Sequence, residues 1–272
     1  MISLAVVPFL ETTLMPTSVL ILTAALLQHA PATEIDQEES VGPWRAIFDG
    51  RTLDGWRGDS TFWSVEDGCI VGRSTTETPC ERTTYLHHPK VLDDFELEFE
   101  IKLEGEGGNS GMQYRSTPWT LKDGDPFDVS GYQADFDREH RYTGILYETY
   151  GRGIAVERGH AVRFAADGTK TPIAPPRSDP ELRAVLRAVD ADHETGGWHT
   201  YRIVADGRRL EHWIDGERMM LAEDHDPRFA KEGILALQIH RGPPMTVRIR
   251  NVRLRDLEPG MPSRIQPSTE GP

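Results

Sequence analysis

The stretch Gly131–Glu148 carries side chains that suit acid–base chemistry and the binding of hydroxyl groups. Its first residues alternate apolar and polar types, and successive side chains of a β-strand point to opposite faces. The set expected to face a core is Tyr132, Ala134 and Phe136. The set expected on the other face is Gln133, Asp135 and Asp137. A polar turn, Asp137–Arg141, should lead into a second strand, Tyr142–Tyr147, with Glu148 just beyond it.

Two other segments carry a polar pair with the same spacing. Gln113 and Arg115 are two residues apart in GMQYR, and Gln238 and His240 are two apart in LQIH. Each pair should share one strand face, and amides, carboxylates, guanidinium and imidazole together can bind a polyol. A solvated sheet face is the alternative for any one strand. We expect the three pairs to converge on one concave face.

Composition limits the class of partner. The chain has 272 residues, a net charge of −14 and a pI of about 5.2, which argues against a nucleic-acid or anionic-membrane partner.

The apolar run SVLILTAALL followed by Ala30-Pro31-Ala32 predicts a signal peptide over residues 1–32, too short to span a bilayer. We therefore expect an exported protein, periplasmic or extracellular, with no membrane insertion after the leader is removed.

The rest of the chain predicts an all-β domain. Residues 33–44 are expected to be a linker, residues 45–257 the domain, and the Pro-rich residues 258–272 a disordered tail. Short strands recur with Asp-Gly turns between them, which favours two antiparallel sheets in a β-sandwich or jelly roll. The clearest strand is Phe95–Leu103, whose outward glutamates need counter-ions, with Arg115 one candidate. One short connecting helix is expected, with Asp179 as N-cap and its end near Val189.

Other motifs are weaker. The glycine-rich segment Gly105–Gly111 is not followed by Lys-Ser/Thr or by a helix, so we interpret it as a tight connection at the rim of a site. Cys69 and Cys80 are equally compatible with a short-loop disulfide and with two free thiols. No Cys/His spacing typical of zinc and no acidic loop typical of calcium is present, so we expect no metal and no cofactor.

At this point the residues resemble a known family. In collinear order, segments such as FDGRTLDGW, GGNSG, GYQADFD and LQIHRGPP make the chain similar to the 3-keto-disaccharide hydrolases over about Phe48–Leu257. The resemblance implies a concanavalin-A-like lectin/glucanase sandwich. It also implies cleavage of 3-keto-glycosides or 3-keto-disaccharides, by hydrolysis or by β-elimination and hydration, and a partner oxidoreductase that supplies the 3-keto-sugar.

Elimination needs a base near C2, donors for the enolate oxygen and an acid for the leaving group. Asp135 or His240 is the expected base, with Arg115 and Gln113 as the enolate donors. The expected acids and sugar-binding residues are Gln133, Gln238, Tyr147, Glu148 and the platform Trp119. A conventional glycosidase built on Asp135 and Asp137, and a non-catalytic carbohydrate-binding sandwich, are the alternatives.

Overall fold

The computed structural model describes residues 42–105, 107–119, 124–192 and 197–258, which form two β-sheets and one helix. In spatial order the larger sheet contains β11 (Lys170–Ala174), β10 (Ala161–Phe164), β14 (Glu217–Asp224), β13 (Arg209–Ile214), β12 (His199–Asp206), β5 (Phe95–Glu104), β16 (Met245–Asp256), β3 (Cys69–Ser74) and β2 (Trp63–Glu66), with β1 (Arg45–Ala46) paired to β16. The smaller sheet contains β4 (Thr84–Leu92), β15 (Gly233–Ile239), β6 (Asn109–Pro118), β7 (Val129–Asp137), β8 (Leu146–Thr149) and β9 (Gly153–Val156).

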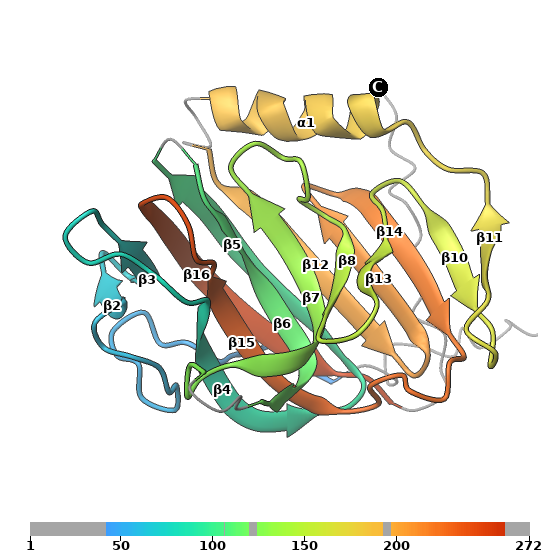
Figure 1. The fold of residues 1–272 in the computed structure, drawn as a ribbon, viewed down its shortest axis with the longest axis horizontal. Coiled ribbons are helices and arrows are strands. Elements are labelled where there is room, and N and C mark those ends of the chain that lie inside the picture. Colours follow the sequence, from blue (N-terminus) through green and yellow to red (C-terminus); the bar gives the residue numbers. More distant parts are fainter. Residues whose placement is uncertain (1–41, 106, 120–123, 193–196, 259–272) are drawn as a thin grey trace, which may run out of the picture. The chain divides into compact units, whose positions relative to one another are not determined.

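The two sheets lie face to face, and the helix α1 (Asp179–Ala191) runs across the strand ends at the top of the view (Figure 1). Every strand pair is antiparallel in the described residues except β10 with β14. The predicted β-sandwich with one short helix is therefore confirmed. No helix in the described ranges is both long and apolar enough to cross a membrane.

Asp-Gly turns close the hairpins that the sequence predicted. Asp67 and Gly68 join β2 to β3, and Asp215 and Gly216 join β13 to β14. All four residues have positive φ, between 50° and 79°. Two successive left-handed residues form the turn whose twist matches that of the flanking strands, which is why Asp-Gly fixes these hairpins.

Strand β5 has the predicted alternation. Phe95, Leu97, Phe99, Ile101 and Leu103 are buried between the sheets. The outward glutamates pair with arginines of the neighbouring strands: Glu96 with Arg202 and Arg255, Glu98 with Arg253, and Glu100 with Arg250. The suggestion that Arg115 supplies a counter-ion is wrong, because the antiparallel partners β12 and β16 provide the cations.

Aromatic stacking within the larger sheet and hydrogen bonds between the two sheets order the core. The ring of Phe99 stacks on that of Tyr201 at 5.4 Å. The Tyr114 hydroxyl lies 3.0 Å from Nε2 of His212, and the Tyr132 hydroxyl donates to Asp224 at 2.6 Å. Tyr132 thus faces the core, as its alternation with Gln133 predicted.

Two local predictions need correction, and the open alternative for the two cysteines is resolved. The N-cap of α1 is Ser178 and not Asp179, whose carboxylate accepts hydrogen bonds from Arg158 and Arg183. Strand β8 starts at Leu146 and includes Glu148, because the carboxylate of Asp137 accepts hydrogen bonds from the backbone N–H groups of residues 141–143 and holds them in a turn. Cys69 and Cys80 are both buried and free. The predicted leader, most of the linker and all but the first residue of the tail lie outside the described residues.

Candidate functional site

An open cavity of about 780 Å³ lies on the face of the smaller sheet that points away from the core. Residues of all six strands and of the loops at their ends contribute to it. Five of the predicted site residues line it: Gln133, Asp135, Tyr147, Gln238 and His240. The volume is within the range of small-molecule sites.

Strand register places these side chains next to one another. Gln133 lies opposite Gln113 of β6 on one side and Tyr147 of β8 on the other. Asp135 lies opposite Gly111, which has no side chain. The β-carbon of any other residue at position 111 would lie 2.6 Å from the carbonyl oxygen of Ala134. The glycine therefore permits close strand pairing and leaves the cavity floor beside Asp135 open.

A chain of amide hydrogen bonds runs across this floor. The Gln238 amide donates to the hydroxyl of Tyr85 at 3.1 Å and exchanges hydrogen bonds of 3.1 Å with the Gln133 amide. The Gln133 amide also donates to the carboxyl of Asp135. Gln113 does not line the cavity: it is fully buried and donates to Gln133 at 2.7 Å from the neighbouring strand β6. Gln113 is thus a support for the floor and not a sugar contact.

The carboxyl of Asp135, on the floor of the cavity, has a strongly raised pKa. It is 5% exposed. Burial raises its pKa from 3.8 to about 8, the hydrogen bond from Gln133 opposes the shift, and the charge of Asp137 reinforces it. A carboxyl in a cavity whose pKa lies near neutrality is suited to proton transfer.

His240 lies at the rim of the cavity, directly after β15. It is exposed, and its Nδ1 lies 2.6 Å from the carbonyl oxygen of Arg241. Because a carbonyl oxygen only accepts, Nδ1 carries the proton and Nε2 is left with a lone pair. His240 is therefore able to act as a base or, once protonated, as an acid.

Arg115 is not in the cavity. Its backbone φ is +46°, and the pairing of β6 with β7 shifts register between Tyr114 and Thr117. This β-bulge breaks the alternation on which the prediction depended. The guanidinium is 1% exposed and donates to the carbonyl oxygens of Asp93 and Gly207 and to the carboxylate of Asp94, at 2.6 to 2.7 Å. Arg115 instead holds together the β4–β5 and β12–β13 turns.

Glu148 also points away from the cavity. It follows Tyr147 in β8, and adjacent residues of a strand face opposite sides. Tyr147 lines the cavity, whereas the carboxylate of Glu148 pairs with Arg152. Asp137 is equally unavailable, because its carboxylate binds the turn after β7. A conventional glycosidase pair of Asp135 and Asp137 therefore finds no support.

An aromatic rim borders one side of the cavity. Trp119 is 44% exposed and does not itself line the cavity, but its ring stacks on that of Tyr150 at 5.8 Å. Tyr150 lines the cavity and donates from its hydroxyl to Asp128 at 2.6 Å. Exposed aromatic faces of this kind can stack on the apolar face of a sugar ring.

Sequence reasoning did not select several lining residues: Arg82, Tyr85, Asn109, Asp125, Asp128, Thr149, Tyr150 and Arg241. Two of them had a usable signal. Thr149 is two residues after Tyr147 in β8 and must share its face, and Asn109 lies within the glycine-rich segment that was predicted to lie at a rim. The others lie in loops or at strand ends, where no periodicity applies.

A family model matches most of the chain. The family described as 3-keto-alpha-glucoside-1,2-lyase-like domain matches residues 43–255. A 3-keto-disaccharide hydrolase from Bacteroides thetaiotaomicron is 40% identical over 90 residues, which are 30% of this chain and 31% of that protein.

Solved structures have a similar fold at low identity. A Bacillus subtilis protein of unknown function with a galectin-like fold has a TM-score of 0.50 at 12% identity, covering 76% of this chain and 91% of that one. The carbohydrate-binding module CBM66 from Bacillus subtilis has a TM-score of 0.44 at 17% identity, covering 73% and 93%.

Proposed function

Because this chain belongs to the 3-keto-alpha-glucoside-1,2-lyase-like domain family, we propose that it is a glycoside-acting enzyme whose substrates are 3-keto-glycosides, including 3-keto-disaccharides. The observation that carries the proposal is Asp135, a buried carboxyl with a pKa of about 8 on the floor of a sugar-sized cavity. The neutral amide of Gln133 contacts it and that of Gln238 lies next along the floor, which suits a substrate that presents hydroxyl groups and a ketone.

The proposed first step is removal of the C2 proton. The ketone at C3 makes this proton acidic, and ionised Asp135 takes it up as general base. The electron pair of the C2–H bond then forms a C1–C2 double bond while the C1–O bond to the leaving group breaks. The leaving oxygen acquires a proton, and water then adds its hydroxyl to C1 and its proton to C2. The products are a free 3-keto-sugar and the released alcohol or sugar.

Other lining residues fit the remaining roles. The developing enolate oxygen requires donors, and the guanidinium of Arg241 is a cation on the lining that can supply them. This role passes to Arg241 because Arg115 and Gln113 are buried outside the cavity. Tyr147 and His240 are the lining groups able to protonate the leaving oxygen. His240 remains the second candidate for the base.

The proposal also includes export of the protein and a separate oxidoreductase that supplies its substrate. Export follows from the apolar run SVLILTAALL and the Ala30-Pro31-Ala32 site, and N-terminal sequencing of protein from the native host should find a start near Thr33. An intact leader in the cytosolic fraction would contradict export. A 3-keto-sugar is an oxidation product, so the substrate must come from an oxidoreductase acting earlier.

The test is incubation of purified protein with 3-keto-trehalose and 3-keto-lactose, with trehalose and lactose as controls. The proposal expects monosaccharide release from the oxidised sugars alone. Running the reaction in D₂O separates the two routes, because elimination and hydration place deuterium at C2, whereas direct hydrolysis leaves the C2 hydrogen in place. Binding of the sugars without release would support the carbohydrate-binding alternative instead.

A further inference from the structure

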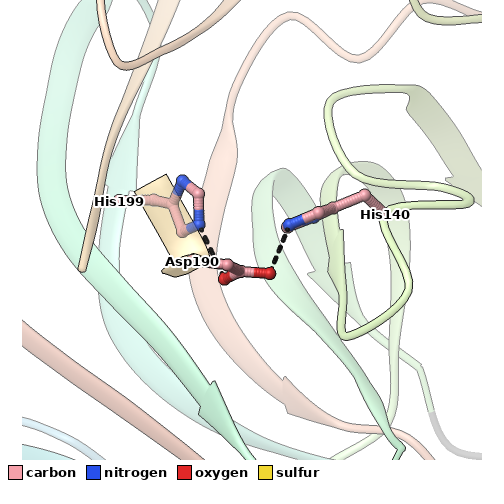
Figure 2. Close-up of side chains that lie close together, drawn as sticks. All are labelled: His140, Asp190 and His199. Carbon is pink, nitrogen blue, oxygen red and sulfur yellow. Dashed lines mark hydrogen bonds and ion pairs between the residues drawn. The ribbon is translucent and has the colours of Figure 1, made fainter. Parts of the chain in front are cut away.

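Two histidines and an aspartate from three separate elements meet away from the cavity. His140 lies in the turn after β7, Asp190 in the last turn of α1 and His199 at the start of β12 (Figure 2). Nε2 of His140 lies 2.9 Å from Oδ2 of Asp190, and Nε2 of His199 lies 3.2 Å from Oδ1. Both histidines are at most 2% exposed.

The second nitrogen of each ring, Nδ1, is already within hydrogen-bond distance of another residue. Nδ1 of His199 lies 2.7 Å from the carboxylate of Asp215, which only accepts, so Nδ1 carries a proton. Nδ1 of His140 lies 3.1 Å from the hydroxyl of Thr143, whose own proton is directed to Asp137. Nδ1 of His140 is therefore a donor as well.

These hydrogen bonds at Nδ1 determine whether each Nε2 atom carries a proton or a lone pair. In a neutral imidazole only one nitrogen carries a proton, so each neutral ring would point the lone pair of Nε2 at a negatively charged oxygen of Asp190. Without a metal, a proton on Nε2 makes the ring an imidazolium ion that pairs with Asp190 and, for His199, also with Asp215, beside the guanidinium of Arg138 3.0 Å from the same carboxylate. A divalent cation is the arrangement that suits neutral rings, because it accepts both lone pairs and one carboxylate oxygen.

We propose that His140, Asp190 and His199 bind one divalent transition-metal ion of the zinc class. One donor atom from each residue lies within 4.8 Å of the other two. Zinc bonds of about 2.0–2.2 Å place tetrahedral donor atoms about 3.3–3.6 Å apart, so the two histidine–Asp190 contacts need to lengthen by a few tenths of an ångström and all three donor atoms need to come within that spacing. Two imidazoles favour zinc, cobalt or iron over magnesium and calcium.

The surroundings are those of a metal site. The hydrogen bond from Nδ1 of His199 to Asp215 is the outer-shell contact that orients a metal-ligating histidine. None of the three ligands lines the cavity. The ion would therefore be structural: it would fasten α1 and β12 to the turn after β7, whose Tyr142 lines the cavity. No sequence spacing indicated the site, because its ligands are up to 59 residues apart (199 − 140).

The test uses the full chain stripped of metal with a chelator and dialysed. Titration with Zn²⁺ by calorimetry and with Co²⁺ by absorption spectroscopy should give one saturable site per chain, with a Co²⁺ spectrum unlike that of the aqueous ion. The melting temperature should rise with Zn²⁺ concentration, because an ion that binds only the folded state stabilises it. His140→Ala and His199→Ala should each weaken binding by at least about 10-fold. His160→Ala, which alters a histidine outside the cluster, should not.

Asp215→Asn covers the case in which an alanine variant fails to fold. It keeps the shape of the outer-shell partner, and it should weaken Zn²⁺ binding by about 10–100-fold. Absence of a saturable site in the wild-type protein would overturn the proposal. So would binding that is unchanged in His140→Ala, His199→Ala and Asp215→Asn, since the ion would then bind elsewhere. Both readouts are independent of any activity on sugars.

Discussion

Gly111 lies directly opposite Asp135 in the pairing of β6 with β7, so β6 has no side chain at the position beside the buried carboxyl. A β-carbon at position 111 would meet the backbone oxygen of Ala134 at 2.6 Å and the Cα of Asp135 at 3.2 Å. The backbone that fixes Asp135 therefore depends on this glycine.

Gly111→Ala should both destabilise the protein and lower its turnover. Backbone atoms of a paired strand cannot move aside as a flexible side chain can, so we expect a loss of about 1–3 kcal/mol, the usual cost of overpacking. Denaturant unfolding and kcat/KM measure the two effects. Gly107→Ala is the matched control, because its β-carbon would meet only a side-chain atom of Pro243, at 3.3 Å. Equal behaviour of the two variants would show that Gly111 has no special role.

The pH dependence of kcat/KM should report Asp135. A general base works in its ionised form, so kcat/KM on a 3-keto-glycoside should rise with pH and level off above an apparent pKa of about 8. This rising limb should be absent from the residual activity of Asp135→Asn. A profile that instead falls through the same range would make Asp135 the general acid and would contradict its assignment as base.

Stability should depend on pH through the same group. The pKa of Asp135 is raised from 3.8 to about 8 on folding, so between these values the folded state holds a proton that the unfolded chain has released. Stability is therefore lost as pH rises through about 8. Asp135→Asn, which stays neutral, should melt at nearly the wild-type temperature near pH 4 and at a higher temperature near pH 9. A melting-temperature difference independent of pH would mean that Asp135 is not buried as a neutral acid.

Substitutions of Arg115 and Arg241 should have different effects: the first should lower stability, and the second should lower turnover. Arg115→Ala removes a buried guanidinium that binds Asp94 and two carbonyl oxygens, so we expect a loss of about 3–5 kcal/mol and little change in kcat of the folded protein. Arg241→Ala should change stability by less than about 0.5 kcal/mol, as surface substitutions do, and should lower kcat. Chemical denaturation and steady-state kinetics of both variants provide the check, and a reversal of the two patterns would return Arg115 to the site.

Period-two alternation was the part of the sequence that carried the most information. It gave the core face of β5 and the cavity face of β7 correctly, because one buried face of a strand specifies its register. It placed Gln238 and His240 at the cavity for the same reason.

The same rule failed where the backbone departs from a regular strand. Arg115 lies at a β-bulge with positive φ, which no side-chain pattern reveals. Asp137 was assigned to the right face, but its carboxylate is used by backbone N–H groups of the following turn. Contacts between distant elements could not be predicted from the sequence. The partners of Asp190 lie in a turn before it and in a strand after it, and only the folded chain brings them together.

The central claim is that Asp135 moves the substrate proton, and turnover of 3-keto-trehalose by Asp135→Asn tests it most directly. Asparagine keeps the shape of the side chain and can still accept the hydrogen bond from Gln133, so the fold should be intact by circular dichroism and thermal melting. His240→Ala, measured beside it, identifies the other candidate base. We predict a loss of at least about 10²-fold in kcat for Asp135→Asn and a smaller loss for His240→Ala. Near-wild-type turnover by a correctly folded Asp135→Asn protein would contradict the assignment.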